Sequence, residues 1–215
     1  YPERDTHIAR GVAKLRSAWA NSLLVYDKSE AGSVDDIISR MRDIRREYPD
    51  KKHISIIDNM FNTNEISRSS EEGGKRYAVD AYMDKMKEQA LLSDGLIINS
   101  VEVQKNTFGR LVLRNIKESG SIEYRSDAIF SMFNSFKEYG DASKVFYMTD
   151  NFVKNPVLEL VFLKLKIGRT GDRFYFDLNG PMGLLYPILD TERIEKYNQL
   201  VMSDNGNNKD AKESV

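Results

Sequence analysis

Apolar residues recur along the first half of the chain with the spacing of helices. An opening helix is predicted from the helical spacing of Ile8, Val12, Leu15 and Trp19. Ser33 begins a second helix, with Asp36 three residues later as the partner in a capping box. A third helix is predicted over about residues 75–92.

Short apolar runs between these helices predict strands. The runs are Leu23–Tyr26 in "SLLVYD", residues 53–58 ("HISIID") and Leu96–Asn99. Because strands that alternate with helices form parallel βαβ units, the runs predict a parallel sheet. The segment 59–74, "NMFNTNEISRSSEEGG", is polar and ends in glycines, so we expect a mobile loop there.

The pattern changes after Asp127. The runs "AIFSMFNSF", "VLELVFLKLK" and "RFYFDL" follow one another with no helix between them, which predicts an antiparallel extension of the sheet. The segment 203–215, "SDNGNNKDAKESV", has few apolar residues and is predicted to be a disordered tail. We therefore expect one α/β domain over residues 1–202.

Composition and charge narrow the possible functions. The 215 residues are 40% hydrophobic and 30% charged, with net charge −1, which is typical of a globular domain. The overall charge does not favour binding to nucleic acid, so any such binding needs a local patch of basic residues. The absence of cysteine excludes disulfides and thiolate metal sites, and two histidines are too few for a histidine-built zinc site. Apolar runs long enough for a membrane span are also absent, and the lack of cysteine fits the reducing interior of a cell, so we expect a cytoplasmic protein.

Asp58 follows the apolar run "ISII". Its carboxylate would lie at the carboxyl edge of a parallel sheet, where open α/β sheets bind ligands. Nucleotide-hydrolysing enzymes use an acid at this place, the Walker B acid, to hold hydrated magnesium. The alternative is a strand that simply ends in aspartate. The phosphate-binding motif G-x-x-x-x-G-K-[ST] is absent, and we interpret "GGKRY" at Gly73–Tyr77 as a loop-to-helix junction.

The segment "KESGSIEYRSD", Lys117–Asp127, places glycine and serines between charged residues directly before an apolar run. Gly120 can be the N-cap of a short helix through Ser126, with Glu123 at the third helical position. Backbone N–H groups of the first turn would then point outward beside Lys117, where an anion is favoured. The simpler interpretation is an ordinary helix cap.

The longer segment "NIKESGSIEYRSDAIFSM" resembles the signature of DnaB-type hexameric replicative DNA helicases. The agreement covers "ESGSIE" and the later Asp127 and Ala128. Two further stretches resemble the family, and the three segments occur along the chain in the same order as in the family. "SVDDIISRMRDIRREYPDKKHISIIDNM" is similar to the helix that leads into Walker B, and "LELVFLKLKIGRTGDRFYFDL" to the segment K-x-R-x-G-x-x-G and its strand. The resemblance covers about Leu23 to Asp177 and implies a RecA-like fold, with a mostly parallel sheet between helices.

The resemblance also implies contacts with DNA. Lys117, Glu118 and Gly120 stand where the family grips the DNA backbone, chiefly through main-chain amides. Gln104 stands where the family often has a DNA-contacting arginine. Such contacts read no bases, so binding is expected to be independent of sequence and sensitive to salt.

A nucleotide site shared between subunits is implied in the same way. Asp58 would position Mg²⁺, and Lys164 and Lys166 stand where the family places a lysine and an arginine finger that reach a neighbour's ATP. The implied cofactors are ATP and Mg²⁺. The implied partners are single-stranded DNA, further copies of the chain in a hexameric ring, and a helicase loader or primase.

Three departures from the family pattern affect the nucleotide site. Lys166 replaces an arginine and lacks its bidentate fork, and Val101 replaces the glutamine that senses the γ-phosphate. The P-loop and its strand, together with the catalytic glutamate, have no counterpart. Each backbone group left unpaired by a missing strand would cost about 1–3 kcal/mol. We therefore expect a longer polypeptide, a strand supplied by another chain, or a rearranged sheet.

The expected function is that of the C-terminal portion of a helicase motor domain. The loop 104–120 would grip single-stranded DNA during ATP-driven replication, and the chain alone is expected to hydrolyse no ATP. The alternative is a non-catalytic RecA-like regulatory or assembly module, which the residues at positions 101 and 166 favour. A RecA-like recombination or clock ATPase is disfavoured by the "ESGSIE" match.

Overall fold

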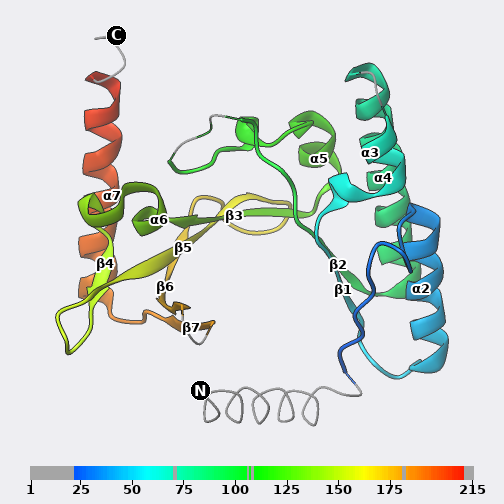
Figure 1. Ribbon diagram of the computed structural model, residues 1–215, viewed down its shortest axis with the longest axis horizontal. Coiled ribbons are helices and arrows are strands. Elements are labelled where there is room, and N and C mark those ends of the chain that lie inside the picture. Colours follow the sequence, from blue (N-terminus) through cyan, green and yellow to red (C-terminus); the bar gives the residue numbers. More distant parts are fainter. Residues whose placement is uncertain (1–21, 70–71, 106, 108, 181–182, 211–215) are drawn as a thin grey trace, which may run out of the picture. The chain divides into compact units, whose positions relative to one another are not determined.

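The computed structural model describes residues 22–69, 72–105, 107, 109–180 and 183–210 (Figure 1). The described chain divides into two compact units. The first contains the residues up to Ala78 and Glu88–Ser100, and the second contains Val79–Lys87 and the residues from Val101 onward. The predicted opening helix lies outside the described residues. In the part that is described, helices long and apolar enough to cross a membrane are absent.

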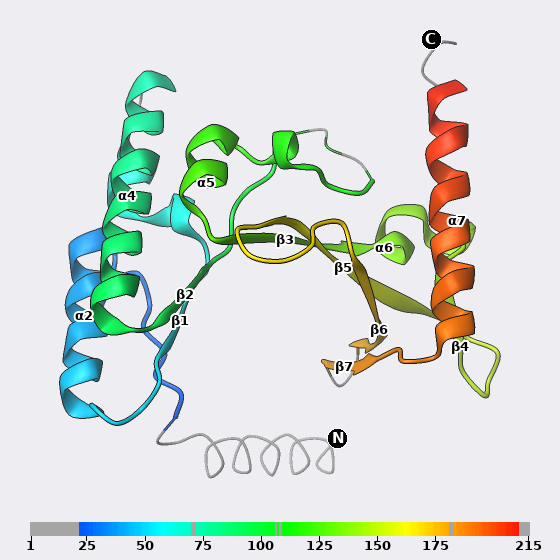
Figure 2. The same ribbon diagram turned by 180° about the vertical axis from the view of Figure 1, so that it is seen from behind.

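The first unit contains a parallel pair of strands. Its elements are α2 (Val34–Glu47), β1 (Ile54–Ile57), the short 3₁₀ helix η1 (Met60–Asn62), α3 (Asn64–Arg68), parts of α4 (Glu72–Ser93), and β2 (Leu96–Asn99). β1 and β2 run side by side and in parallel, with Ile54 opposite Leu96 (Figures 1 and 2). This pairing confirms two predicted strands and their direction.

Helix α2 begins where the capping box predicts. The Ser33 hydroxyl accepts a hydrogen bond from the Asp36 N–H at 3.0 Å, and the Ser33 N–H donates to the Asp36 carboxylate at 3.1 Å. The two bonds satisfy backbone donors that the helix itself cannot pair. Hydrogen bonding from Ser33 also lowers the pKa of Asp36.

The predicted strand Leu23–Tyr26 is not formed. These residues pair with no strand in the described chain, and their side chains are 38–79% exposed. They line an open hollow of about 510 Å³ together with α2 and β1. Ile54 and Ile56 of β1 also line this hollow and are largely exposed. An apolar run becomes a strand only where a neighbour pairs with its backbone, and here that pairing is missing.

The segment 59–74, predicted to be a mobile loop, instead contains η1, α3 and the start of α4. Met60, Phe61 and Ile66 are buried, at 0–4% exposure. These few apolar side chains hold the short helices in place, although the polar residues around them outnumber them. α4 covers the helix predicted over 75–92 and starts earlier, at Glu72.

The second unit contains a five-stranded antiparallel sheet in the order β3-β5-β6-β7, with β4 paired to β5. Its elements are η2 (Leu113–Asn115), α5 (Ser119–Arg125), β3 (Ala128–Asn134), α6 (Ser135–Tyr139), η3 (Gly140–Ala142), β4 (Phe146–Met148), β5 (Lys154–Leu165), β6 (Arg173–Asn179), β7 (Leu184–Pro187) and α7 (Thr191–Asp210). The antiparallel strands predicted after Asp127 are confirmed.

Two details of this second sheet differ from the prediction. The strands form a separate sheet and do not extend the parallel pair. The expected mostly parallel sheet is therefore replaced by two sheets, of which the antiparallel one has more strands. The short helix α6 follows β3 directly, where the sequence predicted no helix. The Asn134 side chain caps it by accepting a hydrogen bond from the Lys137 N–H at 3.1 Å.

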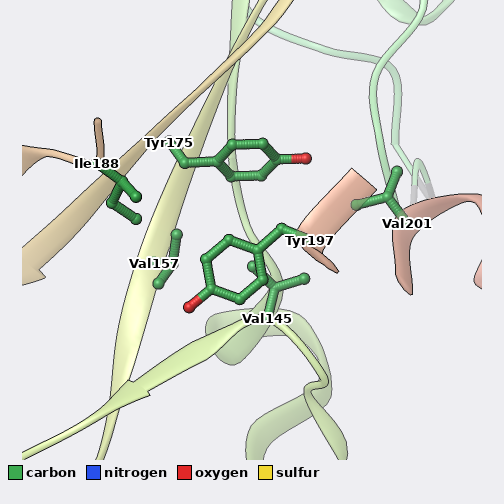
Figure 3. Packing of buried hydrophobic residues seen from close by; sticks show 6 residues of the cluster. All are labelled: Val145, Val157, Tyr175, Ile188, Tyr197 and Val201. Carbon is green, nitrogen blue, oxygen red and sulfur yellow. The ribbon is translucent and has the colours of Figure 1, made fainter. Parts of the chain in front are cut away.

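Helix α7 packs on the antiparallel sheet where a tyrosine of the helix meets a tyrosine of the sheet (Figure 3). The rings of Tyr175 from β6 and Tyr197 from α7 lie 5.5 Å apart, over Val157 of β5. Burial raises the pKa of Tyr175 to about 12. α7 continues to Asp210, into the segment predicted to be a disordered tail, and residues 211–215 lie outside the described chain.

Candidate functional site

Asp58 lies one residue beyond β1, at the carboxyl edge of the parallel pair. Its carboxylate accepts a hydrogen bond from the hydroxyl of Ser100, the residue that follows β2. The Ser100 N–H donates to the Ile57 carbonyl at 3.0 Å, and the Ser100 carbonyl accepts from the Met60 N–H at 3.3 Å. These main-chain bonds hold the exposed carboxylate at the strand ends.

One carboxylate and one hydroxyl are a sparse set of ligands for a metal ion. Groups of three or more acidic or histidine side chains that could hold a metal are absent from the described residues. Magnesium in nucleotide sites often uses one or two carboxylates, and waters and phosphates supply its other ligands. Asp58 and Ser100 therefore fit a magnesium ion that arrives with a nucleotide.

The segment Gly73–Tyr77 lies in the first turns of α4. The Lys75 ammonium stands 5.3 Å from the centre of the Phe61 ring, which is a cation–π distance. This contact gives Lys75 a structural role and agrees with the interpretation of "GGKRY" as the start of a helix.

The predicted DNA-contacting loop is closed at its base by main-chain bonds. Val103 and Ile116 form an antiparallel bridge. The Gln104 N–H donates to the Asn115 carbonyl at 2.8 Å, and the Lys117 N–H donates to the Glu102 carbonyl at 3.1 Å. The Gln104 side chain is exposed.

Lys117 has a side-chain partner within the same loop. Its ammonium forms an ion pair with the Glu102 carboxylate, and the two side chains are 31% and 39% exposed. A ligand phosphate would therefore compete with Glu102 for this ammonium.

Helix α5 begins two residues earlier than predicted. Glu118, with a left-handed φ of 53°, is its N-cap, and Gly120 lies within the first turn. Burial of Ser121 and Ile122 fixes the position of the helix. Gly120 is exposed, and a Cβ added there would meet no atom within 4 Å. The main chain at Gly120 is therefore open to a ligand.

Lys164, on β5, binds the end of α5. Its ammonium donates to the carbonyl oxygens of Glu123 and Ser126, the latter at 2.9 Å. Cations are favoured at this end of a helix because its last carbonyl groups lack partners within the helix.

Lys166 lies next to the same helix end, beside Asp127. Its ammonium is 2.9 Å from one oxygen of the Asp127 carboxylate, and Lys87 of α4 contacts the other oxygen. Hydrogen bonds from Lys87 and Lys166 lower the pKa of Asp127. The second unit thus gathers Lys117 and Gly120 at the start of α5, and Lys164 and Lys166 at its end. Asp58 belongs to the first unit.

A buried carboxylate on β5, Glu159, was not predicted from the sequence. Glu159 is 2% exposed and accepts hydrogen bonds from Arg110 Nε at 2.9 and 3.1 Å, and Arg173 binds it as well. The signal was present in "VLELVF", where Val157, Glu159 and Val161 alternate on one face of the strand. A carboxylate in a buried position requires a cationic partner.

Comparisons with known proteins gave no match: neither a scan against protein-family models nor a search of curated proteins found a relative of this chain.

Proposed function

We propose that this chain is part of the motor domain of a DnaB-type, ring-forming DNA helicase with a RecA-like fold, and that it grips single-stranded DNA. The observation that carries the proposal is the segment "KESGSIEYRSD" and its local structure. The main chain is open at Gly120, and Lys117 lies just before it in the sequence. A phosphodiester can approach a bare main chain closely, and contacts of this kind position DNA without reading its bases.

The proposal assigns the nucleotide-dependent steps to Asp58, Lys164 and Lys166. Asp58, at the edge of the parallel pair, would position Mg²⁺ between phosphates. The two lysines would stabilise charge on the nucleotide of a neighbouring subunit, and to do so they would release the α5 carbonyls and Asp127. The 215 residues contain no G-x-x-x-x-G-K-[ST] motif, so the phosphates would be held by another segment or chain.

DNA binding tests the proposal directly. Lys117→Ala removes one cation from the grip, so we expect weaker binding of labelled oligodeoxythymidine. We also expect the slope of log affinity against log salt to become shallower by at most roughly 0.7. Fluorescence anisotropy at several salt concentrations measures both quantities. Lys196→Ala, at an exposed position on α7, is the control. Equal affinity and slope in Lys117→Ala would contradict the DNA assignment.

The second candidate is a RecA-like regulatory or assembly module without hydrolysis. Its support is that Lys164 and Lys166 are engaged within their own chain, and that Val101 cannot hydrogen-bond a γ-phosphate. Calorimetric titration of the intact gene product, together with any segment that holds the phosphates, with ATP and Mg²⁺ separates the two candidates. A binding heat that Asp58→Ala abolishes supports the motor, and the absence of heat supports the module.

A further inference from the structure

Glu159 connects the antiparallel sheet to the loop that we assign to DNA. It lies on β5 between Phe133 of β3 and Tyr175 of β6, its neighbours in the sheet register. Its side chain is 3% exposed, and the two arginines that bind it come from different places. Arg173 belongs to β6, whereas Arg110 belongs to the loop.

Arg110 is held on two sides. Its Nε donates to both oxygens of Glu159, at 2.9 and 3.1 Å, and its guanidinium carbon lies 5.3 Å from the centre of the Phe133 ring. The side chain is 16% exposed, so water screens the ion pair only weakly. Contacts of this kind fix the position of a planar guanidinium better than an exposed ion pair does.

The neighbouring residue adds a second anchor. The Gly109 N–H donates to the Glu138 carboxylate of α6, and its φ of 74° is one that glycine adopts readily. Main-chain bonds at Gln104 and Lys117 hold the base of the loop, whereas these side chains hold its far part. The far part of the loop is therefore attached to β5 through Arg110 and to α6 through Gly109.

We propose that Glu159 is a positioning residue, which through Arg110 holds residues 109–115 of the loop in the shape that meets DNA. This inference rests on the proposed function, because it assigns a purpose to the shape of the same loop. Its physical basis is that the two arginines bound to Glu159 belong to different parts of the unit, Arg110 to the loop and Arg173 to the sheet. Without Arg110 the carboxylate keeps Arg173, so the sheet retains its own ion pair while the loop loses its anchor.

Hydrogen exchange and DNA binding together test the role of Glu159. In Arg110→Ala, amide exchange in residues 103–116 should rise by about tenfold, as expected for the loss of one charge-assisted hydrogen bond. Affinity for oligodeoxythymidine should fall several-fold, while exchange in β3, β5 and β6 stays unchanged. Arg110→Lys keeps the charge and should restore part of both losses.

Two further variants separate positioning from a general loss of charge or stability. Glu159→Gln should raise loop exchange in the same direction as Arg110→Ala but by less, because Arg110 keeps its contact with the Phe133 ring. The double variant should show no more exchange than Arg110→Ala alone, because Glu159 acts on the loop through Arg110. Arg114→Ala removes an exposed cation from the same loop and should leave loop exchange unchanged.

The two proposals fail in different ways. Unchanged loop exchange in Arg110→Ala overturns the anchor, whatever the DNA result. Raised exchange with undiminished DNA affinity overturns the positioning role and leaves the proposed function intact. If the wild-type chain binds no DNA, the proposed function fails and the positioning role fails with it, while the exchange data still report whether Glu159 anchors the loop.

Discussion

Lys117 is paired with Glu102 before any ligand arrives. DNA binding would therefore exchange one anionic partner of this ammonium for another. Breaking the ion pair between Lys117 and Glu102 would cost part of the energy gained from the contact with phosphate. If the chain binds DNA as proposed, Glu102 would weaken the grip and reduce its dependence on salt by competing for the Lys117 ammonium.

Glu102→Gln should consequently bind oligodeoxythymidine several-fold more tightly than the wild type. The slope of log affinity against log salt should steepen by up to roughly 0.7, because the freed ammonium now acts fully on DNA. The measurement is the same anisotropy titration, with Glu195→Gln on α7 as an exposed control. Weaker binding by Glu102→Gln would instead show that the ion pair supports the shape of the grip.

Asp127 predicts a dependence of stability on pH. Lys87 and Lys166 lower its pKa in the folded protein below the ordinary value of 3.8. The ion pairs therefore stabilise the fold above that value, and their contribution is lost as the pH falls through the lowered pKa.

The variant Asp127→Asn should be less stable than the wild type at neutral pH. The difference should be at most about 1 kcal/mol, because the carboxylate is largely exposed. It should vanish in strong acid, where both proteins lack the charge. Urea unfolding at a series of pH values measures the difference, and a gap that persists in strong acid would argue against an electrostatic origin.

The helices and strands of this chain differ in how much of their position is determined by their own residues. The Ser33–Asp36 box and the apolar spacing of α2 are local, and the helix appears where they predict it. Leu23–Tyr26 has an equally clear apolar pattern and forms no strand, because strand formation requires a second backbone. The start of α5 was shifted for a related reason, since buried Ser121 and Ile122, and not the glycine, set its position.

The cap of α2 gives a prediction for that element. Ser33→Ala removes the hydroxyl that accepts from the Asp36 N–H and should destabilise the helix by about 1 kcal/mol. Amide exchange within α2 should rise accordingly. Ser39→Ala, at an exposed position in the middle of α2, should not have this effect. Equal exchange in the two variants would mean that the cap contributes nothing measurable.

The molecule as a whole contains two units with different strand pairing. The first has two parallel strands, with Ile54 and Ile56 largely exposed. The second has its own core of Val157, Tyr175, Tyr197 and their neighbours. Because each unit has its own internal contacts, we expect the two to lose structure separately.

Val157→Ala tests this independence. Val157 is 1% exposed, and loss of its methyl groups should destabilise the second unit by about 2 kcal/mol. Amide exchange should rise through β5, β6 and α7 and remain unchanged in α2 and β1. A parallel rise in α2 would show that the two units unfold as one.

The sequence by itself determined α2, α4, β1, β2 and the strands β3, β5 and β6, because helix caps, apolar spacing and strand alternation act over a few residues. It also placed Asp58 at a strand end and a short helix before β3, although that helix begins two residues earlier than predicted. It did not indicate β4 and β7. Only the tertiary structure decided which groups meet: Glu102 on Lys117, Asp127 on Lys166, the α5 carbonyls on Lys164, and Arg110 on Glu159. The physical reason is distance along the chain. Lys164, Lys166 and Glu159 lie about 40 to 50 residues from Ser126, Asp127 and Arg110, and local patterns carry no information about contacts that folding alone creates.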